Sequence, residues 1–211
     1  MKNFCIILFF VVNISCNAQD KKENANYNKE SIALNNESVK IILKGGNRHD
    51  NLVRANQLLD SAINIDPSYV IAYGNKIQNL LSLKEYHLAL DWSDSLLSIK
   101  PGSAETLTGK GLIYDKLGDT SRAQANYNTG NQIYRTRYNS DHSINNLKSL
   151  AFNYYLLYGK AKAFELITKE EYRFKNSPQE FKKINQFKNY LSNVKNEELF
   201  GHKNQIGISP E

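Results

Sequence analysis

Apolar and small residues recur along this chain at spacings of three and four, which place side chains on one face of an α-helix. Between residues 104 and 130, Leu107, Gly111 and Tyr114 form one such series, and Ala123 and Tyr127 form a second. The small residues Gly111 and Ala123 would let two helices approach closely, with the tyrosine rings filling the space beside them. The pattern therefore predicts a pair of packed helices.

The short segment between these two series has the chemistry of a turn. Gly118 can adopt the left-handed backbone conformation that ends many helices. Asp119 follows it and can cap the N-terminus of the second helix. We therefore expect the chain to reverse direction here.

The same pattern repeats along the chain with a period of 34 residues. Ala55, Ala89 and Ala123 are spaced by 34, and so are Pro67 and Pro101. Proline cannot continue a helix, so the two prolines fit the turns between successive helix pairs. A period of this length predicts stacked helix pairs, because each pair alone cannot bury its apolar face.

These repeats resemble the tetratricopeptide repeat (TPR), a helix–turn–helix unit of 34 residues. The matching units start near Asn36, Val70, Ala104 and Ile144. The second unit departs from the family pattern at Ile77 and Ser93, Gly45 and Gly46 end the first helix of the first unit early, and about six extra residues precede the fourth. The resemblance implies an all-α, right-handed α-solenoid of about four helix pairs over residues 31–176.

A further helix is predicted near the C-terminus. Ser177, Pro178 and Glu180 have the pattern of a capping box. The apolar residues that follow lie on one helical face: Phe181, Ile184, Phe187, Leu191 and Val194. Residues 177–200 are therefore expected to form a capping helix with a polar outer face, and residues 201–211 a disordered tail.

The N-terminus has the features of an export signal. One positive charge at Lys2 precedes nine consecutive apolar residues at 4–12 and then small residues. Nine residues are too few for a permanent membrane span, which needs roughly 20. Residues 1–15 are therefore interpreted as a signal peptide, and residues 16–30 as a flexible polar tether.

The residues Asn13–Cys16 resemble the lipobox of bacterial lipoproteins, which implies a lipid on Cys16. Cleavage after Ala18 by an ordinary signal peptidase is the alternative. Asn17 is not the Asp associated with inner-membrane retention, so the resemblance favours an outer-membrane lipoprotein that faces the periplasm. Without the lipid, the protein would be secreted to the periplasm.

Charge and histidine spacing argue against several classes of function. The net charge is +6, but the lysines are spread along the chain rather than gathered with aromatic residues in a stripe. We therefore expect no nucleic-acid partner. His49, His87, His142 and His202 have no metal-ligand spacing, so neither a metal nor another cofactor is expected. No catalytic constellation is present, and the chain is interpreted as a non-enzymatic protein.

The resemblance also implies where a partner would bind. Repeats of this family hold a protein or peptide in a concave groove lined by the first helix of each pair. Carried onto this chain, the groove residues are Gln78, Leu81, Glu105, Thr108, Leu112, Asp115, Lys148, Phe152 and Tyr155. The alternative is that Leu112, Phe152 and Tyr155 only pack between helices. Glu105 and Gly109 replace a basic pair that binds a C-terminal carboxylate in some relatives, so that recognition mode is rejected.

These observations together predict a lipid-anchored interaction scaffold of the bacterial cell envelope. Two alternatives stay open. One is an accessory envelope lipoprotein that binds or processes glycans, and the other is a subunit of an outer-membrane assembly complex.

Overall fold

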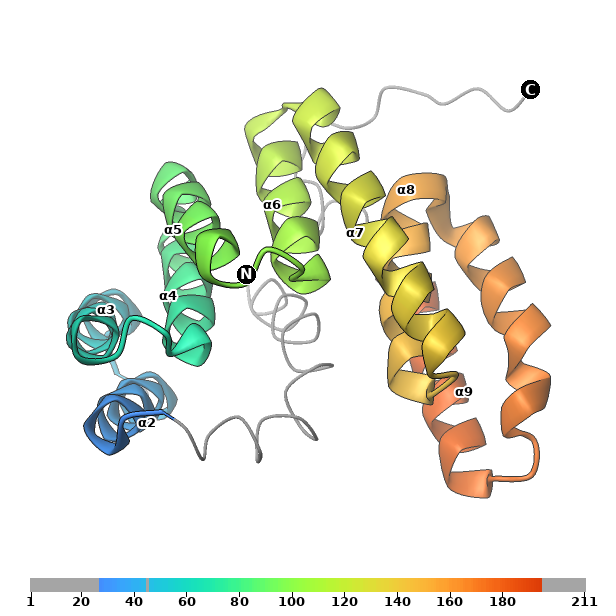
Figure 1. Ribbon diagram of the computed structural model, residues 1–211, viewed down its shortest axis with the longest axis horizontal. Helices are drawn as coiled ribbons and strands as arrows, with labels where there is room; N and C mark the ends of the chain where they lie inside the picture. Colours follow the sequence, from blue (N-terminus) through green and yellow to red (C-terminus); the bar gives the residue numbers. More distant parts are fainter. Residues whose placement is uncertain (1–26, 45, 195–211) are drawn as a thin grey trace. The chain divides into compact units, whose positions relative to one another are not determined.

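The computed structural model describes residues 27–44 and 46–194, and these residues confirm the predicted all-α fold (Figure 1). They form no strand. The described residues fall into two compact units, divided between Thr106 and Leu107. The predicted signal peptide, Cys16, most of the tether and the tail at 201–211 lie outside the described residues.

Unit 1 contains two helix hairpins. The helices α2 and α3 pack together, α3 packs on α4, and α4 lies beside α5 (Figure 1). The repeated alanines Ala55 and Ala89 are completely buried, as expected for the small residues at close helix contacts. The bounds are α2 (Lys29–Leu43), α3 (Arg48–Ile65), α4 (Val70–Leu83) and α5 (Tyr86–Ile99).

The first helix differs from its prediction. It begins at Lys29, seven residues before Asn36, because the Asn28 side chain accepts hydrogen bonds from the first-turn amides of Glu30 and Ser31. The Asn28 amide in turn donates to Asp66 at the end of α3 (2.9 Å). The start of α2 is therefore fixed by a contact with a residue 38 positions away.

The buried side chains of α2 are polar, which the apolar pattern did not predict. They are Ser31, Asn35 and Ser38, and the Ser31 hydroxyl donates to the carbonyl of Ala62 on α3 (2.7 Å). The hydroxyl of Ser38 donates to the carbonyl of Asn35, and Oδ1 of Asn35 accepts from Asn75 of α4, so these buried polar groups have partners. The apolar Leu43 at the end of α2 is instead 77% exposed.

Unit 2 is built on the rest of α6 and on the helices that follow it. Its core pairs are α7 with α8 and α8 with α9, and the short 3-10 helix η2 packs on both α8 and α9 (Figure 1). The bounds are α6 (Ala104–Leu117), which begins in unit 1, α7 (Thr120–Ser140), α8 (Ile144–Glu170), η2 (Glu171–Phe174) and α9 (Pro178–Asn193).

The helix contact predicted around Gly111 is present in unit 2. A Cβ atom on Gly111 would lie 2.5 Å from Cδ1 and 2.9 Å from Cζ of Tyr127, closer than side chains tolerate. Tyr127 is 1% exposed and Ala123 is fully buried. Position 111 therefore requires glycine, because the Tyr127 ring fills the space that the Cβ atom of any other residue would need.

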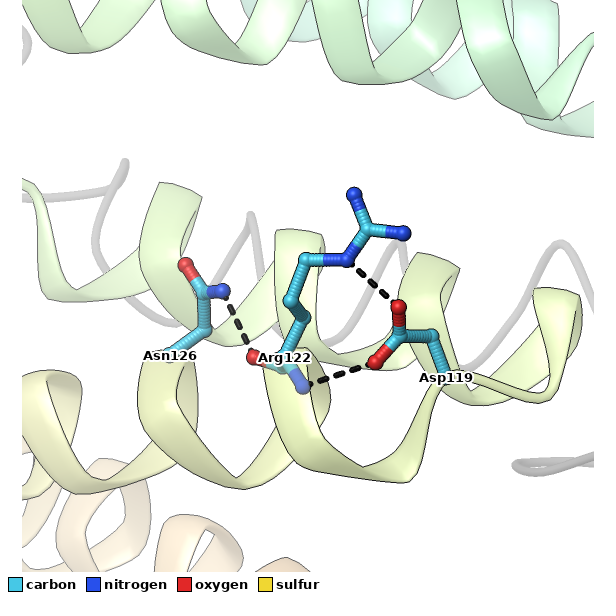
Figure 2. Close-up of polar contacts among 3 residues, drawn as sticks. All are labelled: Asp119, Arg122 and Asn126. Carbon is cyan, nitrogen blue, oxygen red and sulfur yellow. Dashed lines mark hydrogen bonds and ion pairs between the residues drawn. The ribbon is translucent and has the colours of Figure 1, made fainter.

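The turn between α6 and α7 also has the predicted chemistry. Gly118 has a φ of 81°, in the left-handed region. Figure 2 shows the Asp119 carboxylate accepting from the backbone amide of Arg122 (2.9 Å) and from Nε of Arg122 (2.5 Å), while Asn126 donates to the Arg122 carbonyl (2.8 Å). This cap lowers the pKa of Asp119, because the hydrogen bonds from Arg122 favour the ionised form.

The equivalent turn in unit 1 uses a different residue. Lys84 lies 34 positions before Gly118 and has a φ of 64°, although it is not a glycine. Its amide donates to the carbonyl of Leu81, and the next amide, of Glu85, donates to Leu80 (2.9 Å). The hydrogen bonds that end the helix therefore hold a lysine in the left-handed conformation.

The helix α8 contains both helices of the fourth predicted pair. Gly159, with φ 82° and ψ 177°, breaks it into two helical segments. Ala151 and Ala163, one on each segment, are completely buried. Most of the extra residues before this pair do not form a loop, because α7 continues as a helix to Ser140.

The C-terminal helix α9 begins where the sequence predicts, but without the full capping box. Ser177 is the N-cap residue and Pro178 opens the helix, yet the Ser177 side chain makes no capping hydrogen bond. Ile184, Phe187 and Leu191 of the predicted apolar face are buried, Phe181 is partly exposed, and Val194 follows the last helical residue, Asn193. None of the helices described here is both long and apolar enough to cross a membrane.

Candidate partner-binding surface

The nine predicted groove residues all lie on α4, α6 and α8, which begin the second, third and fourth predicted pairs. Gln78, Glu105 and Lys148 are partly exposed. The other six are buried, namely Leu81, Thr108, Leu112, Asp115, Phe152 and Tyr155. Only these three of the predicted groove residues therefore keep partly exposed side chains in the described structure.

Two of the buried residues belong to a polar network inside unit 2. The amide of Asn153, which is completely buried, donates to Oγ1 of Thr108 (3.4 Å) and to the carbonyl of Tyr127 (3.2 Å). Asn131 donates to Oδ1 of Asn153 (2.9 Å). The Tyr127 hydroxyl donates to Oδ2 of Asp115 (2.6 Å). Thr108 and Asp115 thus join α6 to α7 and α8.

The end of α6 holds two ionisable groups in an environment that disfavours charge. Burial raises the pKa of Asp115, although the Tyr127 hydrogen bond and the charge of Lys116 oppose the rise. Burial also lowers the pKa of Lys116 to about 8, partly offset by the negative charge of Asp115. The charged form of Lys116 is therefore less favourable in the folded unit than in the unfolded chain.

Lys148 lies beside α9 in a partly aromatic setting. Its ammonium is 5.7 Å from the centre of the Phe187 ring. Burial lowers the pKa of Lys148, and the positive charge of Lys183 on α9 lowers it further. The predicted groove residue on α8 thus shares its surroundings with two residues of the capping helix.

Gln78 has a polar side chain that the described structure leaves unsatisfied. Both its Oε1 and its Nε2 atoms are shielded from solvent, and neither has a hydrogen-bond partner. Buried polar atoms in folded proteins nearly always have a partner, because desolvating them without one costs about 1–3 kcal/mol each. A ligand that offers one donor and one acceptor would satisfy this amide.

Sequence reasoning missed a second polar centre, in unit 1. Lys76 of α4 is 6% exposed, forms an ion pair with Asp60 of α3, and places its ammonium 3.9 Å from the centre of the Trp92 ring of α5. A signal was present, because Lys76 follows Tyr73 by three and precedes Leu80 by four, which places it on the apolar face. The residue therefore joins three helices rather than facing solvent.

In residues 27–44 and 46–194, no three His, Cys, Asp or Glu side chains gather closely enough to hold a metal ion. A depression at the turn between α2 and α3, lined by Ile42, Gly46, Arg48 and Asn51, contains none of the predicted groove residues.

Comparisons with known proteins identify no family. No family model and no curated protein matches the chain. Among solved structures it is similar to "MamA RS-1 ArsTM double mutant", at 18% identity and a TM-score of 0.38 over 72% of this chain and 98% of the other. It is also similar to "MamA 41-end from Desulfovibrio magneticus RS-1", at 18% identity and a TM-score of 0.39 over 72% and 99%.

At this level of similarity, neither structure indicates a function for this chain. The fold is instead assigned from three features of this chain: the period of 34 residues, the buried alanines and the turn at Gly118. The chain is an all-α protein built from repeated, TPR-like helix pairs.

Proposed function

We propose that this protein is a non-enzymatic scaffold that binds a partner protein or peptide along its first helices and is anchored in the bacterial envelope by a lipid on Cys16. On unit 1 the contacts would be made by Gln78 of α4 and Glu105 of α6, and on unit 2 by Lys148 of α8. The envelope location rests on the N-terminal sequence alone.

The unsatisfied amide of Gln78 is the observation that carries this proposal. A peptide backbone presents one N–H and one C=O per residue, the pair of groups that Nε2 and Oε1 lack. Because both atoms are shielded from solvent, the Gln78 side chain would have to turn outward to meet a partner segment next to α4, and it would break no hydrogen bond of its amide by doing so. The partly exposed Glu105 and Lys148 offer a negative and a positive group to the same class of ligand.

Site-specific photocrosslinking tests the binding surface. A photoreactive amino acid would replace Gln78, Glu105 or Lys148 in the full chain, and envelope fractions would be irradiated. Matched controls would place it at the exposed Asn64 of α3 and Gln124 of α7, which lie on second helices. These sites avoid the buried Phe152 and Tyr155, whose replacement would disturb the core.

We expect one envelope protein to be crosslinked from the first-helix positions and not from the controls. Equal crosslinking at all five positions, or none at the first-helix positions, would refute the binding surface. Capture of a glycan instead of a protein would favour the glycan-binding alternative.

The anchor needs a separate test. We expect Cys16→Ser to move the protein from the membrane fraction to the soluble fraction, and mass spectrometry of the wild-type N-terminus to detect an acylated Cys16. A mature chain that begins at Gln19 would show cleavage after Ala18 and would end the lipid proposal, leaving the binding surface unaffected.

A further inference from the structure

The two units differ in charge. The described residues of unit 2, 107–194, contain 14 Lys and Arg and 7 Asp and Glu, a net charge of +7. Those of unit 1, 27–44 and 46–106, contain 8 and 9, a net charge of −1. The positive charge of the described chain is therefore concentrated in the C-terminal unit, which favours an anionic partner there.

Ion pairs within unit 2 do not remove this surplus. Each one pairs one base with one acid, so the excess of bases stays unchanged. Among the described residues such pairs include Arg122 with Asp119, Lys162 with Glu165, Arg173 with Glu170, and Lys188 with Glu171. A fifth acid, Asp115, is buried and bonded to Tyr127, so it presents little negative charge at the surface.

Positive charge is focused where α8 meets α9. Lys148 of α8 lies where this helix packs on α9, and the positive charge of Lys183 adds to burial in lowering the pKa of Lys148. Lys183 precedes Phe187 by one helical turn, and the Lys148 ammonium lies 5.7 Å from the Phe187 ring. Two like charges therefore lie beside the same aromatic side chain.

We propose that Lys148 and Lys183 form a binding site for an acidic side chain of the partner, with a carboxylate lying between the two ammonium groups. This inference rests on the proposed function and names the chemistry of its partner. A carboxylate there attracts both cations and relieves their mutual repulsion. Because Lys148 is half-buried beside Phe187, the site suits a single side chain more than the broad charged surface of a membrane.

Binding of a defined acidic peptide tests the site. The probe is a fluorescein-labelled hexaglutamate peptide, titrated with purified full-length protein in detergent and followed by fluorescence anisotropy. A hexalysine peptide of equal length and vesicles with and without anionic phosphatidylglycerol serve as comparison ligands. The variants are Lys148→Gln, Lys183→Gln and Lys148→Arg, and Lys169→Gln removes one exposed charge elsewhere in unit 2.

We expect each glutamine variant at Lys148 or Lys183 to weaken hexaglutamate binding about three- to tenfold, the effect of losing one charge-assisted contact. Lys148→Arg keeps the charge and should retain most of the affinity, and Lys169→Gln should change it less than twofold. Circular dichroism would confirm that each variant is folded.

Several results would overturn the inference. The first is that hexaglutamate does not bind. The second is that Lys169→Gln weakens hexaglutamate binding as much as the variants at Lys148 and Lys183 do. The third is that the protein binds anionic vesicles but not the peptide. Failure of this site can be distinguished from failure of the proposed function. If photocrosslinking from Gln78 and Glu105 captures a partner while the lysine variants bind hexaglutamate like the wild type, the scaffold stands and the acidic site does not.

Discussion

Replacing Gly111 by Ala tests whether the close contact between α6 and α7 depends on a missing side chain. The new methyl group would lie 2.5 Å from Cδ1 of Tyr127. Tyr127 has little freedom to move away, because it is 1% exposed, its hydroxyl is bonded to Asp115 and its carbonyl accepts from Asn153. We therefore expect the substitution to strain unit 2.

The expected magnitude follows from three opposing contributions. Alanine in place of glycine inside a helix stabilises by about 1 kcal/mol. Overpacking a core costs about 1–3 kcal/mol, and displacing the Tyr127 hydroxyl from Asp115 costs about 1–3 kcal/mol more. The free energy of unfolding should thus fall by about 1–5 kcal/mol.

A matched control lies on the same helix. Gly109 is two residues away, and a Cβ atom there would have no neighbour within 4 Å. Gly109→Ala should therefore raise the free energy of unfolding by up to about 1 kcal/mol. Urea unfolding followed by far-ultraviolet circular dichroism measures both variants.

Two outcomes would refute this reasoning. One is a Gly111→Ala protein as stable as Gly109→Ala. The other is an unchanged cost of Gly111→Ala in a Tyr127→Leu background, where the ring is absent and the cost should largely disappear.

Three further substitutions test other features by the same urea unfolding. Lys84→Gly should stabilise by about 1 kcal/mol, because glycine adopts a φ of 64° without the cost paid by lysine, and an unchanged midpoint would contradict this. Asn153→Ala should destabilise by about 2–4 kcal/mol, since it leaves the buried Asn131 amide and Tyr127 carbonyl without their partner, and a loss below about 1 kcal/mol would show that water replaces it. Folding lowers the pKa of Lys116 from 10.5 to about 8, so the contribution of Lys116 to stability is present above about pH 10.5 and is lost as pH falls through about 8. The free energy of unfolding of the wild type should therefore rise relative to that of Lys116→Gln between about pH 8 and pH 10. Parallel pH profiles of the two proteins would exclude this effect.

The candidate surface shows how far a repeat pattern leads toward a binding site. The sequence placed all nine groove residues on the first helices of their pairs, and the structure has them there. Whether each is accessible depends on what covers it. Thr108 is buried and accepts a hydrogen bond from Asn153, 45 residues later, a pairing that no local sequence pattern could predict. The influence of Lys183 on Lys148 was not predicted either, because it depends on how α9 packs against α8.

By itself the sequence determined the repeating helix pairs, their starts at Val70, Ala104 and Ile144, and the left-handed turn at Gly118. Each of these depends on residues close together in the chain, where helical spacing and the freedom of glycine act directly. Only the tertiary structure decided the polar buried face of α2 and the continuation of α7 through the inserted residues. In these places hydrogen bonds and packing between helices outweigh local preference, because their partners are brought together only when the chain folds.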